Sequence, residues 1–283
     1  MATFTNRATL SYNGRTTDSN VVTGTFLETL SITKTALVDQ YSRDSVITYA
    51  ISLVNSGGTS FTGLTVTDDL GAYSFDATVL YPLEYVAGSL LYYVNGVLQA
   101  TPAVSETSPL TVGGISVPAG GNAMLIYSAD VSAAAPLEAG ATVVNTVIAD
   151  GAGLAEPISA SETVYVIDGP ELTITKSLSP TTVAENGTLT YTFVISNYGN
   201  TAATATDDAV VSDTFDPILA ISSVTLDGAT LAEGTGYTYN AATGEFATVA
   251  GVITVPEATY TQGADGAYSI TPGEATLVVV GTV

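Results

Sequence analysis

Apolar and polar residues alternate with a period of two along much of the chain, and this is the spacing of β-strands. In residues 30–36, Leu30, Ile32 and Ala36 fall on one face, and the Ser and Thr residues between them fall on the other. Almost no long segment has the 3.6-residue spacing of an amphipathic helix. Thr and Val are abundant, as they are in strands. The pattern predicts an all-β fold.

The chain contains two copies of one pattern. The stretch LSITKTALVDQYSRDSVITYAISLVNSGGTS, from Leu30, reappears as LTITKSLSPTTVAENGTLTYTFVISNYGNTA, from Leu172. Later, GLTVTDDLG corresponds to AVVSDTFDP, and PAGGNAMLIYSADV corresponds to TPGEATLVVVGTV. Repeats of this length indicate a domain copied in tandem. We expect two β-sandwich domains, at residues 29–168 and 169–283.

The second copy lacks a piece that the first copy has. After Val131 the first copy continues into TVVNTVIADG and SETVYVID, two strand-like segments with no counterpart near Val283. The N-terminal residues ATFTNRATLSYNGRTTDSNVVTGTF match that piece, and Asn13-Gly14 is a reversal signal between two strands. A frayed tail is the alternative. We expect residues 1–28 to be donor strands, whose inward face carries Phe4, Asn6, Ala8, Leu10 and Tyr12.

The linkers favour donation of these strands to another molecule. Only Glu28 and Thr29 separate them from the first domain, and the connection around Gly169 is as short. At about 3.3 Å per extended residue, neither linker spans a domain. Strand addition to a neighbour is therefore simpler than self-completion. A head-to-tail contact that does not close makes a fibre, and a strand-swapped closed dimer is the competing arrangement.

Two lysines interrupt the apolar faces of equivalent strands. Lys34 shares a face with Leu30 and Ile32, and Lys176 occupies the same place in the second copy. A buried, unpaired charge is costly, so we expect partners. The residues that fall in phase with neighbouring apolar positions are Asp68 and Asn145 in the first copy, Asp213 in the second, and Asn6 in the N-terminal strand.

Lysine, aspartate and asparagine together suggest a spontaneous isopeptide bond. Burial lowers the pKa of a lysine and raises that of an aspartate, so a neutral amine can attack the asparagine amide while a protonated carboxyl shuttles the proton. The predicted bonds are Lys34 to Asn145 within a subunit, assisted by Asp68, and Lys176 to Asn6 of a neighbour, assisted by Asp213. The alternative is a noncovalent Lys–Asp pair that fixes register.

Composition excludes several classes of function. The formal charge is −22, from 27 acidic and five basic side chains, and such a field repels nucleic acid. The chain has no Cys and no His, so we expect no thiol chemistry, no zinc or other metal, and no cofactor. No run of apolar residues is long enough to cross a membrane. The N-terminal stretch MATFTNRATLSYNG has no signal-peptide pattern, so we expect either that an export signal was removed or that assembly precedes lysis of the producing cell.

Two rival classes have weak candidates. Enzyme or calcium-site candidates are the acidic turns Asp68-Asp69 and Asp207-Asp208, with Asp213 and Asp216 nearby, but they match no known calcium loop. We expect no enzyme beyond the autocatalytic bond. A binding module would use a tyrosine patch such as Tyr81, Tyr85, Tyr92 and Tyr93, although strand tyrosines more often cover sheet surface.

The repeats resemble the tandem Ig-like repeats of bacterial surface proteins. The resemblance is carried by ITKTA and ITKSL at the repeat starts, ITYAISLVNSGGT and LTYTFVISNYGNT in mid-repeat, the V-x-D stretches ending at Asp68 and Asp213, and NTV or NRAT near the repeat ends. It implies Ig-like sandwiches, a place on a cell or spore surface, and similarity to pilins and adhesins with Lys–Asn or Lys–Asp cross-links. A fibre subunit is the expected function, and a two-repeat adhesin or stalk fragment, with an unknown ligand, is the alternative.

Overall fold

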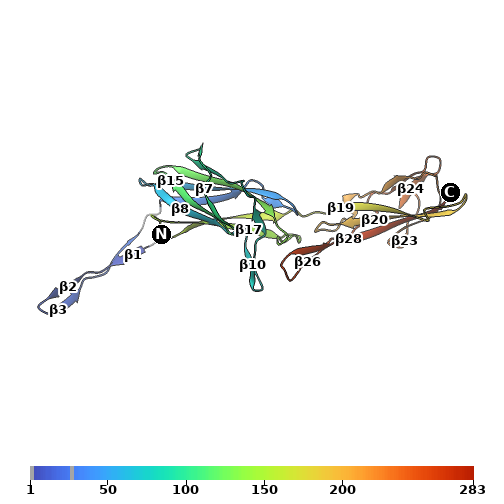
Figure 1. The fold of residues 1–283 in the computed structure, drawn as a ribbon. Coiled ribbons are helices and arrows are strands. Elements are labelled where there is room, and N and C mark those ends of the chain that lie inside the picture. The colour runs from blue at the N-terminus through green and yellow to red at the C-terminus, as the bar shows by residue number, and fades with distance from the viewer. Residues whose placement is uncertain (1–2, 26–28) are drawn as a thin grey trace. The chain divides into compact units, whose positions relative to one another are not determined.

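The chain forms an all-β structure with two compact units. The computed structural model describes residues 3–25 and 29–283, and its units comprise residues 1–136 with 142–165, and residues 137–141 with 166–283 (Figure 1). Apart from one 3-10 turn, η1 (Ala205–Asp207), the regular elements of these described residues are strands. The all-β fold predicted from the alternating pattern is confirmed.

Unit 1 is a sandwich of two antiparallel sheets. The first has the order β13 (Val97–Leu98), β12 (Leu91–Val94), β16 (Asn122–Val131), β7 (Val46–Asn55) and β5 (Leu30–Ala36), with β11 (Leu83–Tyr85) also paired to β16. The second has the order β14 (Val104–Thr107), β15 (Leu110–Val117), β8 (Phe61–Asp68), β17 (Thr142–Asp150), β18 (Ile158–Val166) and β6 (Gln40–Tyr41). The strands β9 (Tyr73–Phe75) and β10 (Thr78–Leu80) form a separate hairpin that is hydrogen-bonded to neither sheet.

The core of unit 1 follows from the period-two pattern. On β7, Ile47, Tyr49, Ile51 and Leu53 are fully buried, and the residues between them are partly or fully exposed. The facing strand of the other sheet, β8, buries Leu64 and other alternate residues in the same way. Each such apolar side chain stabilises the fold by about 1.5–3 kcal/mol relative to an exposed one.

Unit 2 repeats the first sheet of unit 1 and part of the second. Its first sheet has the order β19 (Leu172–Ser179), β20 (Thr188–Asn197), β28 (Gly273–Thr282), β22 (Ala220–Leu226) and β23 (Ala229–Thr230), which correspond to β5, β7, β16, β12 and β13. Its second sheet has the order β21 (Ser212–Thr214), β25 (Glu245–Thr248) and β24 (Tyr237–Asn240), which correspond to β8, β15 and β14. In the described part of unit 2, β21 is therefore an edge strand where β8 has β17 beside it.

The structure adds one detail to the repeat alignment. The strands β16 and β28 correspond as expected, and the counterpart of Pro118 is Pro256, which precedes an insertion. The backbone carbonyls of Pro118 and Pro256 each accept from an equivalent buried asparagine, Asn55 or Asn197, at 2.9 Å. A hairpin of β26 (Thr259–Gln262) and β27 (Tyr268–Thr271) is inserted after this point in unit 2. The two repeats therefore lose their common spacing between Pro256 and β28.

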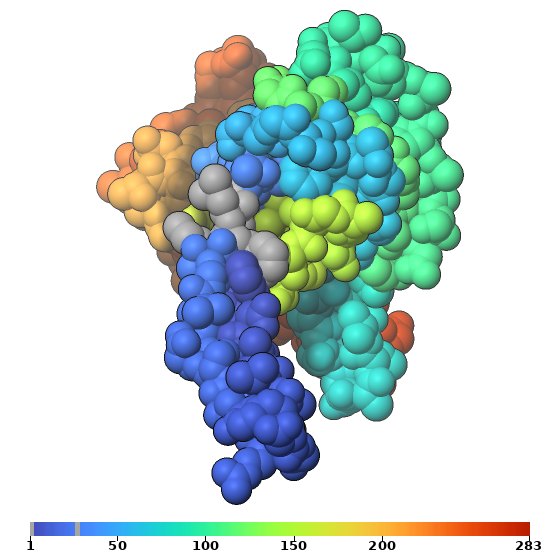
Figure 2. Space-filling view, turned by 90° about the vertical axis from the view of Figure 1, so that its left-hand side faces the viewer, coloured from blue at the N-terminus to red at the C-terminus, as the bar shows by residue number. Residues whose placement is uncertain are grey.

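The N-terminal residues form two short strand pairs. β1 (Thr3–Asn6) pairs with β4 (Val22–Thr25), and β2 (Thr9–Tyr12) pairs with β3 (Arg15–Asp18). Asn13 and Gly14 both have positive φ, 46° and 73°, as a tight reversal between twisted strands requires. The continuous strand expected from Phe4 to Tyr12 is wrong, because residues 7–8 lie opposite residues 19–21 and form a bulge. In the space-filling view of Figure 2 this segment is the narrow blue projection. Its apolar side chains, such as Leu10, are exposed.

Candidate functional site

Lys34 and Asp68 meet inside unit 1, from opposite sheets of the sandwich. Lys34 lies in the middle of β5, where it pairs with Ile51 and faces inward with Leu30, as the alternation predicts. Its ammonium contacts Asp68 Oδ2 at the end of β8, and the two side chains are 0% and 1% exposed. Asp68 Oδ1 accepts from the backbone N–H of Leu70 at 3.1 Å. The pair is thus sealed from water.

Tyr127 on β16 connects this pair to Asn145 on β17. Its hydroxyl donates to Asp68 Oδ2 at 2.8 Å and accepts from Lys34 Nζ at 3.2 Å. Asn145 is fully buried, and its Nδ2 donates to the same hydroxyl at 3.1 Å. The lysine amine and the asparagine amide therefore both lie within hydrogen-bond reach of one oxygen. The structure brings Lys34, Asp68 and Asn145 together, as their phase in the sequence suggested.

Burial changes the acid–base character of these groups. The pKa of Lys34 is lowered from its ordinary value of 10.5, mainly because burial disfavours the ammonium form, and Asp68 offsets part of this effect. The pKa of Asp68 is raised from 3.8, again mainly by burial, with Lys34 acting in the opposite direction. Both shifts favour the neutral amine and the protonated carboxyl. Those are the forms that attack on an amide needs.

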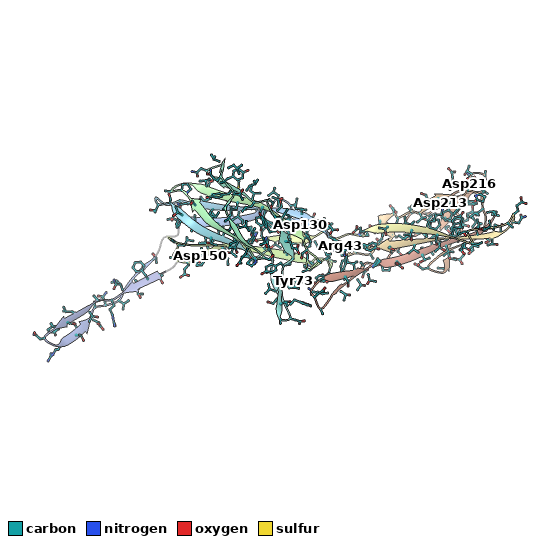
Figure 3. The ribbon with its side chains drawn as sticks, viewed as in Figure 1. Arg43, Tyr73, Asp130, Asp150, Asp213 and Asp216 are labelled. Atoms are coloured by element: carbon teal, nitrogen blue, oxygen red, sulfur yellow. The ribbon has the colours of Figure 1, made fainter. Side chains whose placement is uncertain are left out.

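Lys176 and Asp213 form the equivalent pair in unit 2, but this pair is open. Lys176 on β19 contacts Asp213 Oδ2 on β21, and its side chain is 42% exposed, against 18% for Asp213. Figure 3 labels Asp213. The expectation that both lysines lie buried is wrong for Lys176 in the single chain. The physical reason is that β21 pairs with β25 on one edge and with no described strand on its other edge, where β8 has β17, and β17 covers Lys34.

The inward face of β19 is uncovered along its whole length. All eight residues of β19 are exposed, including Leu172 at 38% and Ile174 at 52%, whereas Leu30 at the start of β5 is only 4% exposed. A groove of about 580 Å³ lies along β21, β25 and β24, with Asp213 and Phe246 among its lining residues. Unit 2 therefore exposes an apolar row, an unpaired strand edge and a half-solvated ion pair at one place.

The N-terminal strands have the register of the strands that cover Lys34. In unit 1, Asn145 on β17 pairs with Glu162 on β18, and in the N-terminal segment Asn6 on β1 pairs with Val22 on β4. The next inward pair is Val143 with Val164 in unit 1, and Phe4 with Gly24 in the N-terminal segment. Gly24 has no room for a Cβ, because the ring of Phe4 lies over it. The packing of Phe4 against Gly24 fixes the register of β1 and β4, and this register sets the position of Asn6.

The rival acidic sites have local structural roles. Asp69 Oδ1 accepts from the N–H of Gly71 at 2.9 Å and of Thr146 at 2.8 Å, and this ties β8 to β17. Asp207 closes η1 by accepting from the N–H of Thr204 at 2.7 Å. Among the residues that the structure describes, no group of three or more acidic side chains is arranged to hold a metal ion. These aspartates are turn and cap residues.

The tyrosine patch is partly internal. Tyr92 is buried, and its hydroxyl donates to Ser116 O at 2.9 Å. The ring of Tyr85 packs against Tyr127, with centroids 6.3 Å apart. Sequence reasoning missed Tyr127 and Tyr49, whose rings stack at 5.6 Å beside Lys34. Both tyrosines fall in phase with the apolar residues of β7 and β16, and this phase predicts their burial but does not assign them to the site.

Comparisons with known proteins found solved structures of low similarity to this chain. No protein-family model matched, and no curated protein gave a significant match. The collagen-binding domain of a Staphylococcus aureus adhesin is similar over 50% of this chain and 99% of its own, with 12% identity and a TM-score of 0.31. The Streptococcus pneumoniae pilus backbone protein is similar over 88% of this chain and 49% of its own, with 14% identity and a TM-score of 0.34. The Bacillus cereus major pilin subunit is similar over 96% of this chain and 73% of its own, with 11% identity and a TM-score of 0.36. In the described residues, no helix is long and apolar enough to span a membrane.

Proposed function

We propose that this chain is a structural subunit of an extracellular fibre, on a cell or spore surface, that polymerises head to tail. Residues 1–28 of one molecule add to the free edge of β21 in the next. The single observation that carries the proposal is the shared register: β1 and β4 pair as β17 and β18 do, and unit 2 has an open edge at the position where unit 1 has β17. Strand addition supplies main-chain hydrogen bonds, and alternate side chains supply specificity.

The register defines the intermolecular contacts. In unit 1, Val147 lies opposite Asp68 on the antiparallel strand β8. With Asn6 in the place of Asn145, Ala8 of the donor lies opposite Asp213 of the acceptor, and Leu10 lies opposite Val211. The inward residues Phe4, Asn6, Ala8 and Leu10 then cover the apolar face of β19. Tyr12, beyond the bulge, extends the same face toward the tip of the donor.

We further propose that each lysine forms an isopeptide bond. Neutral Lys34 Nζ attacks the side-chain carbonyl carbon of Asn145, the proton passes through Asp68 to the leaving nitrogen, and ammonia departs. The same step joins Lys176 to Asn6 of the neighbouring molecule, with Asp213 as the proton shuttle. Contacts of the Lys34 ammonium with Asp68 and Tyr127, and of Asn145 with the same hydroxyl, support the first bond. A noncovalent pair is the alternative outcome at each site.

Negative-stain electron microscopy of the purified chain tests the fibre proposal, beside a variant that lacks residues 1–20. We expect thin fibres from the full chain and none from the variant, because the variant has lost the strand that carries Asn6. A matched control replaces exposed Asn20 with Ala, and this variant should still form fibres. Closed dimers or monomers from the full chain contradict polymerisation, and leave a two-repeat stalk or adhesin fragment whose ligand must be sought separately.

A further inference from the structure

Two buried polar atoms beside Lys34 lack a hydrogen bond. They are Oη of Tyr49 and Oδ1 of Asn145, and they are the unsatisfied buried side-chain atoms among the described residues. A phenol can donate, and an amide oxygen can only accept. Buried polar groups in folded proteins are normally paired, so an unpaired donor and an unpaired acceptor in one pocket require an explanation.

The hydrogen bonds of Tyr127 fix which way the Asn145 amide points. The single hydroxyl proton of Tyr127 goes to Asp68, so the Asn145 atom that faces this hydroxyl must be the donor Nδ2. Oδ1 is therefore directed elsewhere in the pocket. Burial raises the pKa of Tyr49 well above its ordinary value, and the Asn145 amide beside it offsets part of that effect. Tyr49 Oη nevertheless makes no hydrogen bond.

We propose that the Tyr49 hydroxyl is a catalytic residue of the Lys34–Asn145 cross-link, and that it donates to Oδ1 when negative charge develops there. This inference rests on the cross-link proposed above. As Nζ bonds to the amide carbon, the C–O double bond becomes a C–O single bond and Oδ1 becomes an oxyanion. Tyr49 stabilises that oxyanion, Asp68 returns the Nζ proton to Nδ2, and the C–Nδ2 bond breaks to release ammonia. A donor that is unpaired in the ground state binds most strongly in the transition state.

The second repeat supports this assignment, because it keeps this tyrosine and not the other. Tyr191 on β20 corresponds to Tyr49, and the lysine Nζ lies 4.7 Å from the ring centroid of Tyr191 and 4.8 Å from that of Tyr49. Tyr127 is replaced by Val279, since Tyr127 pairs with Tyr49 and Val279 pairs with Tyr191. The phenol that both sites share is therefore the one that the proposal uses. Tyr191 would act on Asn6 of the donated strand.

The rate of ammonia loss tests the role of Tyr49 in the full-length chain. Chains carrying Asn6→Ala, so that only the first bond can form, are synthesised in a short cell-free pulse, quenched in acid at intervals and weighed intact. The Tyr49→Phe change should slow the loss of ammonia by about 10²–10³-fold. The matched control is Tyr92→Phe, which removes a buried hydroxyl that is bonded to Ser116 and should leave the rate unchanged. Hydrolysis of the asparagine amide replaces ammonia with water, and its product differs in mass from the cross-linked chain.

The outcomes separate this inference from the cross-link itself. Loss of ammonia at the same rate from the parent and Tyr49→Phe chains overturns the role of Tyr49 and leaves the cross-link standing. No loss from the parent overturns both. If protease sensitivity shows that the Tyr49→Phe chain does not fold, the proposal is tested instead with Tyr191→Phe in a chain that keeps Asn6. Its fibres should become resistant to denaturant about 10²–10³-fold more slowly, and an unchanged rate overturns the proposal.

Discussion

Replacing Asp68 with Ala should lower the free energy of unfolding of unit 1 by about 3–5 kcal/mol, because the Lys34 ammonium is then buried without a counter-charge. The side chain of Lys34 is 0% exposed, so water cannot replace the lost partner. Denaturant unfolding monitored by tyrosine fluorescence measures the change. The background is a chain that lacks residues 1–20 and carries Asn145→Ala, so that neither isopeptide bond can form and Lys34 stays a free amine.

The equivalent change in unit 2 is the matched control. Asp213→Ala removes the same carboxylate from Lys176, whose side chain is 42% exposed and can be solvated. We expect a loss of about 1 kcal/mol or less for this half-exposed pair. Equal losses at the two sites would contradict the interpretation that unit 2 is open in the single chain. A small loss at Asp68 would mean that Lys34 is not held as a buried partner of that carboxylate.

Replacing Asn6 with Ala should remove the covalent links between subunits and keep the fibres. Strand addition uses backbone hydrogen bonds and the apolar residues Phe4, Ala8 and Leu10, none of which this change alters. The isopeptide bond needs the Asn6 amide as its electrophile. Gel electrophoresis after boiling in detergent should give a ladder for the parent and for the Asn20→Ala control, and a monomer band for Asn6→Ala. A ladder that persists without Asn6 would contradict the assignment of the Lys176 bond.

The alternation of apolar and polar residues was sufficient to predict the all-β fold and three residues of the buried site. Lys34, Asp68 and Asn145 each interrupt an apolar face in phase with it, so their convergence follows from the sandwich geometry. Tyr49 and Tyr127 could not be singled out in this way, because a tyrosine in phase with a core is ordinary. Their role depends on which polar atoms lie opposite them across two sheets, and spacing along one strand does not contain that information.

Other differences have equally local causes. The period-two alternation in β19 predicts that Lys176 faces inward. Its burial, however, depends on an additional strand at the edge of β21, and no residue within β19 indicates whether that strand is present. The bulge opposite residues 7–8 is invisible to the pattern, because the extra residue lies on the other strand, between Asp18 and Val22. The inserted hairpin β26–β27 likewise separates Pro256 from β28, so spacing along the chain could not identify Pro256 as the counterpart of Pro118.

Strand donation in the proposed register can be tested by disulfide cross-linking between introduced cysteines, because the chain has no cysteine of its own. By the pairing of Ile148 with Thr67 in unit 1, Thr9 of the donor lies opposite Ser212 of the acceptor. Directly opposite residues in antiparallel strands have Cα atoms about 4.5–5.5 Å apart, within the range that a disulfide accepts. The variant Thr9→Cys/Ser212→Cys, with Asn6→Ala to remove the isopeptide link, is oxidised and run on a non-reducing denaturing gel. The account predicts a ladder of multimers that collapses to monomer on reduction, and an oxidised monomer or a single dimer band would contradict it.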